Sequence, residues 1–279
     1  MHLTKYTSNQ LYRRLHVGHP SDVDIYRRLC RGAHRVLDLG CGWGRIALPL
    51  AESGHLVVGL DIEPEFLQEC AEQAQLRGLS SLVHVIDADA CAAVLDHRVQ
   101  THGPFERVLF PYNTLYALGG AQRVTQCLSN LVAHLATDAE VWFDAYDVDE
   151  FHSSLEDDED SMAESEEPDA AVASWEIAGH TVDVFELSQV SRAQQRLTVS
   201  YQARLRETGQ QLGDQTLGHD YLLASDLDEI FDAAGYSLAG CYPRRALLPD
   251  SEAPQTDDDE GSEQLFYLAY HQGAQGLRP

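Results

Sequence analysis

The segment of residues 36–45, VLDLGCGWGR, holds the residues best suited to chemistry in this chain of 279 residues. A short apolar run carries the acid Asp38, and glycines follow at the alternate positions Gly40, Gly42 and Gly44. This pattern predicts a buried strand, a tight glycine turn and a helix. Such a turn lets the backbone approach a ligand closely and directs N–H groups of the helix N-terminus toward it. We therefore expect this segment to bind a nucleotide-like ligand.

The spacing of the glycines favours one kind of ligand over another. The dinucleotide fingerprint is G-x-G-x-x-G, whereas this chain has Gly40-x-Gly42-x-Gly44. The carboxylate of Asp38 just before the turn would repel a pyrophosphate, but it would attract an ammonium or sulfonium group. The segment resembles the first motif, D-x-G-x-G-x-G, of the class I S-adenosylmethionine-dependent methyltransferases, in which the acid lies near the methionine end of the cofactor. The resemblance implies S-adenosylmethionine as the cofactor.

Two further segments follow in the order that this family has. Residues 56–61, LVVGLD, predict a second strand that ends in Asp61. A carboxylate at this place can accept hydrogen bonds from both ribose hydroxyls, a feature that NAD sites share. Residues 82–86 predict a third strand, after which the resemblance places Asp89 and Ala90 beside the adenine ring, with Asp87 less favoured.

Residues 105–114, FERVLFPYNT, resemble the fourth strand of the family and the loop beside the transferred methyl group. The whole resemblance implies a set of cofactor-binding residues, in which Cys41 contributes its backbone rather than a nucleophilic thiol. These residues are Tyr12, Asp38, Gly40, Cys41, Gly42, Arg45, Asp61, Ile62, Asp89, Ala90 and Phe110. We predict no metal site.

Transfer of a methyl group from a sulfonium is a direct displacement, to which positioning contributes much of the catalysis. The acceptor must arrive neutral or lose a proton to a nearby base, and an aromatic pocket suits the dispersing positive charge. Tyr112, Asn113 and Tyr116 follow the fourth strand, where the reacting group would lie. We predict His219 as the base or substrate-orienting residue and Tyr221 as a pocket wall; the alternative for His219 is a histidine satisfied on a strand surface. The predicted catalytic set is therefore His219, Tyr221, Tyr112 and Asn113.

The alternation of strands and helices over residues 35–149 predicts an α/β fold with a Rossmann-like, doubly wound sheet. The sheet should be mostly parallel, with an antiparallel C-terminal strand that resembles the closing hairpin of the family. Period-two patterns after residue 173 predict an antiparallel β insertion that acts as a lid. We expect a helical N-terminal lid at 1–30, the methyltransferase core at 31–150 and 222–279, and the acidic loop with the β insertion at 151–221.

The elements that must position these residues follow from periodicity and from capping residues. Expected helices span residues 9–15, 22–30 with Ser21-Asp22 as cap, 45–53 bent at Pro49, 64–77, 121–136 and 225–234 with Ser225 as cap, and a short helix lies within 87–97. Expected later strands span residues 140–144, 174–177, 181–187, 196–205, 237–242 and 264–270. In the N-terminal lid, Tyr6, Tyr12, His16 and His19 are candidates for the rim of the active site, the alternative for each being a packing or surface side chain.

The net charge of −26 restricts the partners of the chain. A polyanion would be repelled, so DNA and RNA are not expected as substrates. The acidic runs at 156–160 and 257–260 are expected to be solvated loops; attraction of a cationic substrate and adaptation to a salty cytoplasm are the alternatives. Six cysteines without a CxxC pair, no signal-peptide pattern and no membrane-spanning stretch predict a cytoplasmic protein that binds no membrane.

The order of parts is similar to that of small-molecule N-methyltransferases of the glycine and amino-sugar type. We therefore expect methyl transfer to an amine, or a hydroxyl, of a small molecule by a monomer or homodimer. A peptide or protein methyltransferase is an alternative within the same class, since the acidic segment could suit a basic peptide. A nicotinamide-dependent oxidoreductase would share Asp61 but leaves Asp38 and the glycine spacing unexplained. A non-catalytic cofactor-binding protein is the remaining alternative.

Overall fold

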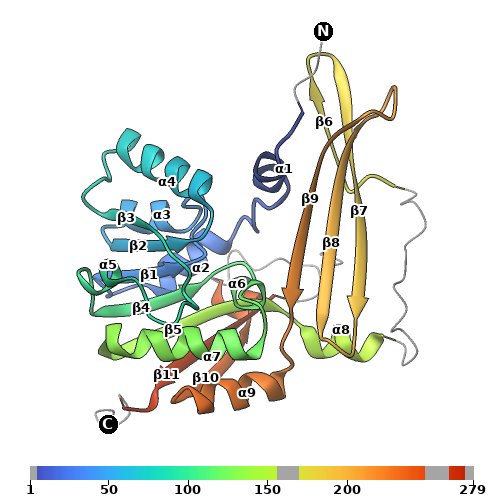
Figure 1. The fold of residues 1–279 in the computed structure, drawn as a ribbon. Helices are drawn as coiled ribbons and strands as arrows, with labels where there is room; N and C mark the ends of the chain where they lie inside the picture. The colour runs from blue at the N-terminus through green and yellow to red at the C-terminus, as the bar shows by residue number, and fades with distance from the viewer. Residues whose placement is uncertain (1–4, 156–169, 249–263, 274–279) are drawn as a thin grey trace. The chain divides into compact units, whose positions relative to one another are not determined.

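The computed structural model describes residues 5–155, 170–248 and 264–273 (Figure 1). The chain divides into two units, one made of residues 1–18 and 152–221 and a larger one made of residues 19–151 and 222–279. Residues 1–30, which we expected to act together as a lid, are shared between the two units. The predicted acidic runs at 156–160 and 257–260 lie outside the described residues.

The larger unit is built on a seven-stranded sheet in the order β10-β11-β5-β4-β1-β2-β3. The strands are β1 (Arg35–Leu39), β2 (Leu56–Asp61), β3 (Val83–Asp87), β4 (Phe105–Phe110), β5 (Leu135–Tyr146), β10 (Tyr236–Pro243) and β11 (Gln264–His271). Strands β1 to β5 pair in parallel, whereas β11 runs antiparallel to both β5 and β10. The strand order reverses direction between β1 and β4, which is where open α/β sheets bind ligands beyond the carboxyl ends of their strands.

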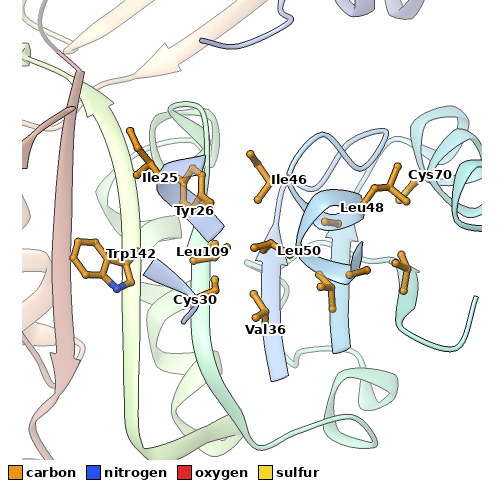
Figure 2. Close-up of a cluster of buried hydrophobic side chains, with 14 of the residues drawn as sticks. Ile25, Tyr26, Cys30, Val36, Ile46, Leu48, Leu50, Cys70, Leu109 and Trp142 are labelled. Atoms are coloured by element: carbon orange, nitrogen blue, oxygen red, sulfur yellow. The ribbon is translucent and has the colours of Figure 1, made fainter. Parts of the chain in front are cut away.

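Helices cover both faces of this sheet, as expected for a doubly wound fold. They are α2 (Asp22–Leu29), α3 (Ala47–Glu52), α4 (Pro64–Leu76), α5 (His97–Gln100), α6 (Thr114–Ala117), α7 (Ala121–Leu131) and α9 (Ala224–Ala233), with 3-10 turns at Val132–His134 and Arg244–Leu247. Figure 2 shows the core on one face, where Tyr26 of α2 and Leu50 of α3 lie with Leu109 of β4 and Trp142 of β5 in one buried cluster. On the other face, Phe143 of β5 stacks on Phe231 of α9 at 5.2 Å between ring centroids. The predicted fold class is confirmed.

The smaller unit contains an antiparallel sheet in the order β6-β7-β8-β9. Its strands are β6 (Ala173–Ile177), β7 (His180–Ser191), β8 (Arg196–Leu205) and β9 (Gln211–Asp220). Helix α1 (Ser8–Leu15) packs on this sheet because Leu11 lies fully buried among Val182 and Val184 of β7. The expected antiparallel insertion is confirmed, but β9 was not predicted, since Gly213 and Gly218 interrupt its alternation.

Three predicted helix boundaries are wrong for identifiable reasons. Helix α3 begins at Ala47, so Pro49 lies in its first turn, where a missing N–H leaves no hydrogen bond unmade and no bend is needed. Residues 88–96 form no helix, and the short α5 begins at His97 behind an Asp96 cap. Helix α7 ends at Leu131, because the residues from Leu135 onward already pair as β5.

The predicted caps also need correction. Ser21 precedes α2 but its side chain makes no capping hydrogen bond; Asp22 instead accepts the N–H of His19 at 3.1 Å. Ser225 lies within α9, and the helix start is secured by Asp226, whose carboxylate accepts the N–H of Leu223 at 2.9 Å. Helix α8 (Val148–Ser154) follows β5. Among the described helices, none combines the length and apolar character needed to cross a membrane.

Candidate active site

The glycine turn after β1 is fastened to the end of β2. The N–H groups of Gly40 and Cys41 both donate to the carbonyl of Leu60, at 2.8 and 3.1 Å. The N–H of Gly42 donates to Oδ2 of Asp61 at 2.8 Å. All three glycines of the motif have positive φ, between 53° at Gly42 and 86° at Gly44, a backbone region that favours glycine. The sequence therefore folds residues 40–44 into a turn that places the ends of β1 and β2 side by side.

The glycines of this turn serve different purposes. A Cβ at Gly40 would lie 2.7 Å from Cγ2 of Thr114, so packing excludes one there. A Cβ at Gly42 would meet no atom within 4 Å, so the turn is open at this point. The thiol of Cys41 packs beside Gly59, where a Cβ would come within 2.5 Å of it, and burial raises the pKa of this thiol well above its usual value. Cys41 is thus a neutral packing residue whose backbone alone belongs to the turn.

Asp38, in β1, is a buried acid for which the described part of the chain offers no hydrogen-bonding partner. Its side chain is 1% exposed, and neither carboxylate oxygen accepts a hydrogen bond from the described residues. Burial raises its pKa to about 7; Arg45 opposes this shift, Asp61 adds to it, and the nearby N–H of Ala47 lowers the pKa without meeting hydrogen-bond geometry. Burying a carboxyl without a partner is costly. An ammonium group of a bound ligand would supply the missing partner, so the site fits the cofactor that the sequence motif implies.

Asp61 and Ile62, at the end of β2, are the other predicted cofactor contacts on this side. Oδ1 of Asp61 accepts the N–H of Glu63 at 2.9 Å, while Oδ2 holds Gly42. A carboxylate has about four acceptor positions, so Asp61 keeps acceptor capacity for ribose hydroxyls. Burial raises the pKa of Asp61, against the hydrogen bonds from Glu63 and Gly42. The side chain of Ile62 is 72% exposed, an unusual state for an isoleucine, and it offers an apolar surface next to Asp61.

In the segment after β3, Asp89, which was predicted to lie beside adenine, forms an ion pair with α7. The carboxylate of Asp89 forms two hydrogen bonds with Arg123 of α7, at 2.9 and 3.0 Å, and accepts the N–H of Cys91 at 2.8 Å. Burial raises the pKa of Asp89, but these bonds outweigh it and lower the pKa overall. Ala90 is buried, and its carbonyl accepts from Asn130. Any contact of Asp89 with adenine must therefore use acceptor positions that Arg123 leaves open.

The turn after β4 carries two of the predicted catalytic residues. Phe110 is fully buried in the core, so its side chain is not at the surface of the site. Tyr112 and Asn113 both have left-handed backbones, with φ of 60° and 58°, which is uncommon for residues other than glycine. Tyr116 is 1% exposed and its hydroxyl donates to the carbonyl of Leu222 at 3.4 Å, so its side chain is a packing group rather than part of the turn.

A buried polar network surrounds this turn, and sequence reasoning missed most of it. Arg45 pairs with Asp22 of α2 at 2.8 Å, and its guanidinium carbon lies 5.0 Å from the ring centroid of Tyr112. The carboxylate of Asp144, in β5, accepts hydrogen bonds from the N–H of Tyr112 at 2.7 Å and from the hydroxyl of Tyr26. An acid within the apolar run VWFDAY was the signal that could have identified Asp144.

In the smaller unit, His219 lies in β9, the last strand of the insertion. Burial lowers its pKa, with Asp220 opposing, so the imidazole is neutral at pH 7 and able to accept a proton. His16 lies near enough for the two imidazoles to interact electrostatically. Burial lowers the pKa of His16 to about 4, and its ring lies 4.5 Å from Tyr12 and 5.3 Å from Tyr201, measured between centroids. The fold thus brings Tyr12, His16 and His219 together within this unit.

Tyr221 is part of a hydrogen-bonded chain that the sequence did not reveal. Nε of Arg192 donates to Nε2 of His152 at 3.3 Å, and Nδ1 of His152 lies 3.0 Å from the Tyr221 hydroxyl. A neutral His152 that accepts at Nε2 carries its proton on Nδ1 and donates it to the Tyr221 oxygen. Burial raises the pKa of Tyr221, with Arg192 opposing, so the hydroxyl keeps its proton within a side chain that is 1% exposed.

Comparison with known sequences identifies the domain. A family described as "Methyltransferase domain" matches residues 36–138. The 23S rRNA (uracil(1939)-C(5))-methyltransferase RlmD of Shewanella sp. (strain ANA-3) is 46% identical over 48 residues, which are 17% of this chain and 11% of RlmD. The ubiquinone biosynthesis O-methyltransferase of Xylella fastidiosa (strain M23) is 33% identical over 101 residues, 30% of this chain and 39% of that protein. The chain therefore spans only a tenth to two fifths of the length of these curated relatives.

Solved structures resemble the chain over nearly its full length. The CcbJ methyltransferase from Streptomyces caelestis has a TM-score of 0.67 at 20% identity, covering 91% of this chain and 97% of CcbJ. The sugar N-methyltransferase KedS8 from Streptoalloteichus sp. ATCC 53650 has a TM-score of 0.61 at 15% identity, covering 96% and 94%. These identities establish a shared fold. Residues 36–138 therefore match a methyltransferase domain, and the chain shares its fold with methyltransferases of solved structure.

Proposed function

We propose that the chain transfers a methyl group from S-adenosylmethionine to an amine, or else a hydroxyl, of a small molecule. The observation that carries this proposal is Asp38, a buried carboxylate that accepts no hydrogen bond from the described residues and precedes an open glycine turn. A cofactor with an ammonium group supplies the partner that Asp38 lacks, whereas the pyrophosphate of a nicotinamide dinucleotide does not. The methyltransferase domain match over residues 36–138 supports the same assignment.

Different residues of the larger unit are proposed to bind different parts of the cofactor. Asp38 would bind the ammonium group, Asp61 the ribose hydroxyls and Ile62 the adenine face. When bound, S-adenosylmethionine supplies a methyl carbon that is already electrophilic. The contribution of the chain is then to hold the acceptor in line and to exclude water. Tyr112 and Asn113, which follow β4, are proposed to face the acceptor.

A small-molecule acceptor is proposed over a nucleic acid. The net charge of −26 would repel a polyanion, and the match to RlmD is confined to 48 residues. KedS8, which is described as a sugar N-methyltransferase, shares the fold across both units of this chain. This similarity favours an amine on a small molecule. The ubiquinone O-methyltransferase match keeps a hydroxyl acceptor as the second candidate. A cytoplasmic location and a monomeric or homodimeric state remain predictions.

His219 is proposed as the base or orienting residue, and Tyr221, whose side chain is 1% exposed, is proposed as part of the wall behind the acceptor pocket. A neutral His219 can take the proton that the acceptor loses, and the chain from Arg192 through His152 orients the Tyr221 hydroxyl. H219N should therefore lower kcat by about 10²-fold or more without weakening binding of S-adenosylhomocysteine. Y221F should raise KM for the acceptor. Unchanged kinetics in both variants would remove these residues from the reaction.

The proposal is tested by binding and then by turnover. Calorimetric titration should show binding of S-adenosylhomocysteine and none of NAD; binding of NAD alone would overturn the methyltransferase assignment. Formation of S-adenosylhomocysteine is then measured with D-glucosamine, glycine, catechol and a lysine-rich peptide as acceptors. Turnover of the amines fits the proposal best, and turnover of the peptide alone would favour a peptide methyltransferase. Binding without turnover of any acceptor would favour a non-catalytic cofactor-binding protein.

A further inference from the structure

The turn formed by Tyr112 and Asn113 has a left-handed backbone, which tyrosine rarely adopts. Both have positive φ, 60° and 58°; asparagine tolerates this region better than other residues with a Cβ, so the unfavourable conformation is that of Tyr112. Such conformations persist only when the surrounding structure holds them, and they occur disproportionately at functional sites. The contacts around the turn therefore show what the molecule uses to hold it.

Asp144 makes the central contact that holds the Tyr112–Asn113 turn in place. Its carboxylate is fully buried and accepts three hydrogen bonds: from the N–H of Tyr112 at 2.7 Å, from the hydroxyl of Tyr26, and from Nε2 of Gln264 at 2.5 Å. The donors come from the turn itself, from α2 and from β11, so one side chain connects three separate parts of the larger unit to it. With these bonds made and no exposed surface, Asp144 acts on the turn rather than on a ligand.

Two further contacts hold the rest of the turn. The Arg45 guanidinium lies over the Tyr112 ring and is itself held by Asp22, at 2.8 Å. Oδ1 of Asn113 accepts the N–H of Tyr146 at 3.0 Å. The backbone of Tyr112, its ring and the side chain of Asn113 are thus each held by a separate contact. Arg45 follows the glycine turn, so these contacts also join the two turns of the proposed site.

We propose that Asp144, with Tyr26 as its partner, is a positioning residue that holds the Tyr112–Asn113 turn in the conformation that methyl transfer requires. The inference rests on the proposed function. Loss of the Tyr26 hydroxyl leaves the Asp144 carboxylate less firmly held, and loss of the Asp144 carboxylate leaves the N–H of Tyr112 without its acceptor. The turn then relaxes toward negative φ and carries the Tyr112 ring away from Arg45. Cofactor binding at Asp38 and Asp61 uses other residues and is left intact.

The test compares two buried tyrosines. Y26F removes the hydroxyl that donates to Asp144, whereas Y236F removes a hydroxyl that donates to the carbonyl of Leu128 at 2.9 Å, away from the turn. Both side chains are fully buried, so the two variants lose comparable packing and one hydrogen bond each. Hydrogen exchange of the peptide covering residues 110–116 should become about tenfold faster in Y26F and stay unchanged in Y236F.

Kinetics then separates positioning from cofactor binding. With the fastest acceptor of the panel above, Y26F should lower kcat about tenfold or more while KM for S-adenosylmethionine changes less than about threefold. Y236F should leave both constants unchanged. Equal exchange and equal kinetics in the two variants would overturn the proposal. A rise in KM for S-adenosylmethionine at unchanged kcat would do the same, because it would make Tyr26 a cofactor-binding residue.

Substitution of Asp144 gives an independent check. D144N keeps an oxygen that can accept from Tyr112 and Tyr26, so it should recover most of the exchange protection and kcat that D144A loses. A D144N variant as impaired as D144A would show that the charge, and not the hydrogen-bonded geometry, matters. If D144A fails to fold, the pair of tyrosine variants still decides the question. Absence of turnover by the wild type would overturn the proposed function, whereas the exchange result stands without it.

Discussion

Replacement of Asp38 by asparagine should reveal that this site is electrostatically incomplete without its ligand. In the folded chain, burial raises the pKa of Asp38 to about 7, with Arg45 opposing and Asp61 adding to the shift. The unfolded value is about 3.9, so the difference corresponds to about 4 kcal/mol of stability. Because the folded pKa is the higher one, this stability is fully present below about pH 4 and is lost as pH rises through about 7. Ionisation of Asp38 therefore destabilises the folded wild type at high pH, whereas D38N has no group to ionise at this position.

The measurement is the free energy of unfolding of both proteins in urea at pH 4.5 and pH 8. The asparagine amide carries its own burial cost, but that cost is the same at both pH values and cancels in the comparison. The stability difference between D38N and the wild type should therefore shift by about 3 kcal/mol in favour of D38N between pH 4.5 and pH 8. Titrating groups that do not interact with Asp38 are common to both proteins and cancel as well.

At high pH D38N should gain stability relative to the wild type, but it should bind the ligand more weakly. S-adenosylhomocysteine should bind D38N about 10- to 100-fold more weakly than the wild type at pH 7, since a hydrogen bond to a charged group is lost. Wild-type affinity should rise about fivefold from pH 6 to pH 7 as Asp38 ionises. A pH-independent stability difference, or undiminished binding by D38N, would refute the view that Asp38 is a buried acid that awaits an ammonium group.

Other perturbations test neighbouring parts of the argument. D61A should weaken binding of S-adenosylhomocysteine by about 1–3 kcal/mol through lost hydrogen bonds to ribose, and unchanged affinity in calorimetry would show that the ribose lies elsewhere. G40A should destabilise the chain more than G42A in urea unfolding, because both have positive φ but only Gly40 faces Thr114 at 2.7 Å; the reverse order would contradict the geometry of the turn. Burial lowers the pKa of His16 to about 4, so the stability that its neutral form contributes is present above pH 6.5 and falls as pH drops toward 4. H16Q should therefore lose less free energy of unfolding than the wild type between pH 7 and pH 4.5. Parallel stability profiles of the two proteins would contradict this.

Much of the fold follows from local patterns in the sequence. Apolar runs that end in Asp61 or that carry Asp38 before a series of glycines can form little other than parallel strands with tight turns, so the sheet and the cofactor motif were predictable. The period-two segments after residue 173 likewise predicted an antiparallel sheet. Strand β9 was not predicted because Gly213 and Gly218 interrupt the alternation of apolar and polar residues. Its strand conformation comes from pairing with β8.

The sequence by itself determined which residues could meet the ammonium and ribose groups of a cofactor, because those residues follow consecutive strands at short range. The tertiary structure alone decided how the site is held. Tyr26 and Asp144 are 118 residues apart in the chain, and Asp22 meets Arg45 across a turn between α2 and the glycine motif. Whether a buried acid has a partner depends on such contacts, and Asp144 has three whereas Asp38 has none among the described residues. Periodicity and spacing carry no information on pairing over such distances, since it arises only when the sheet brings its strand ends together.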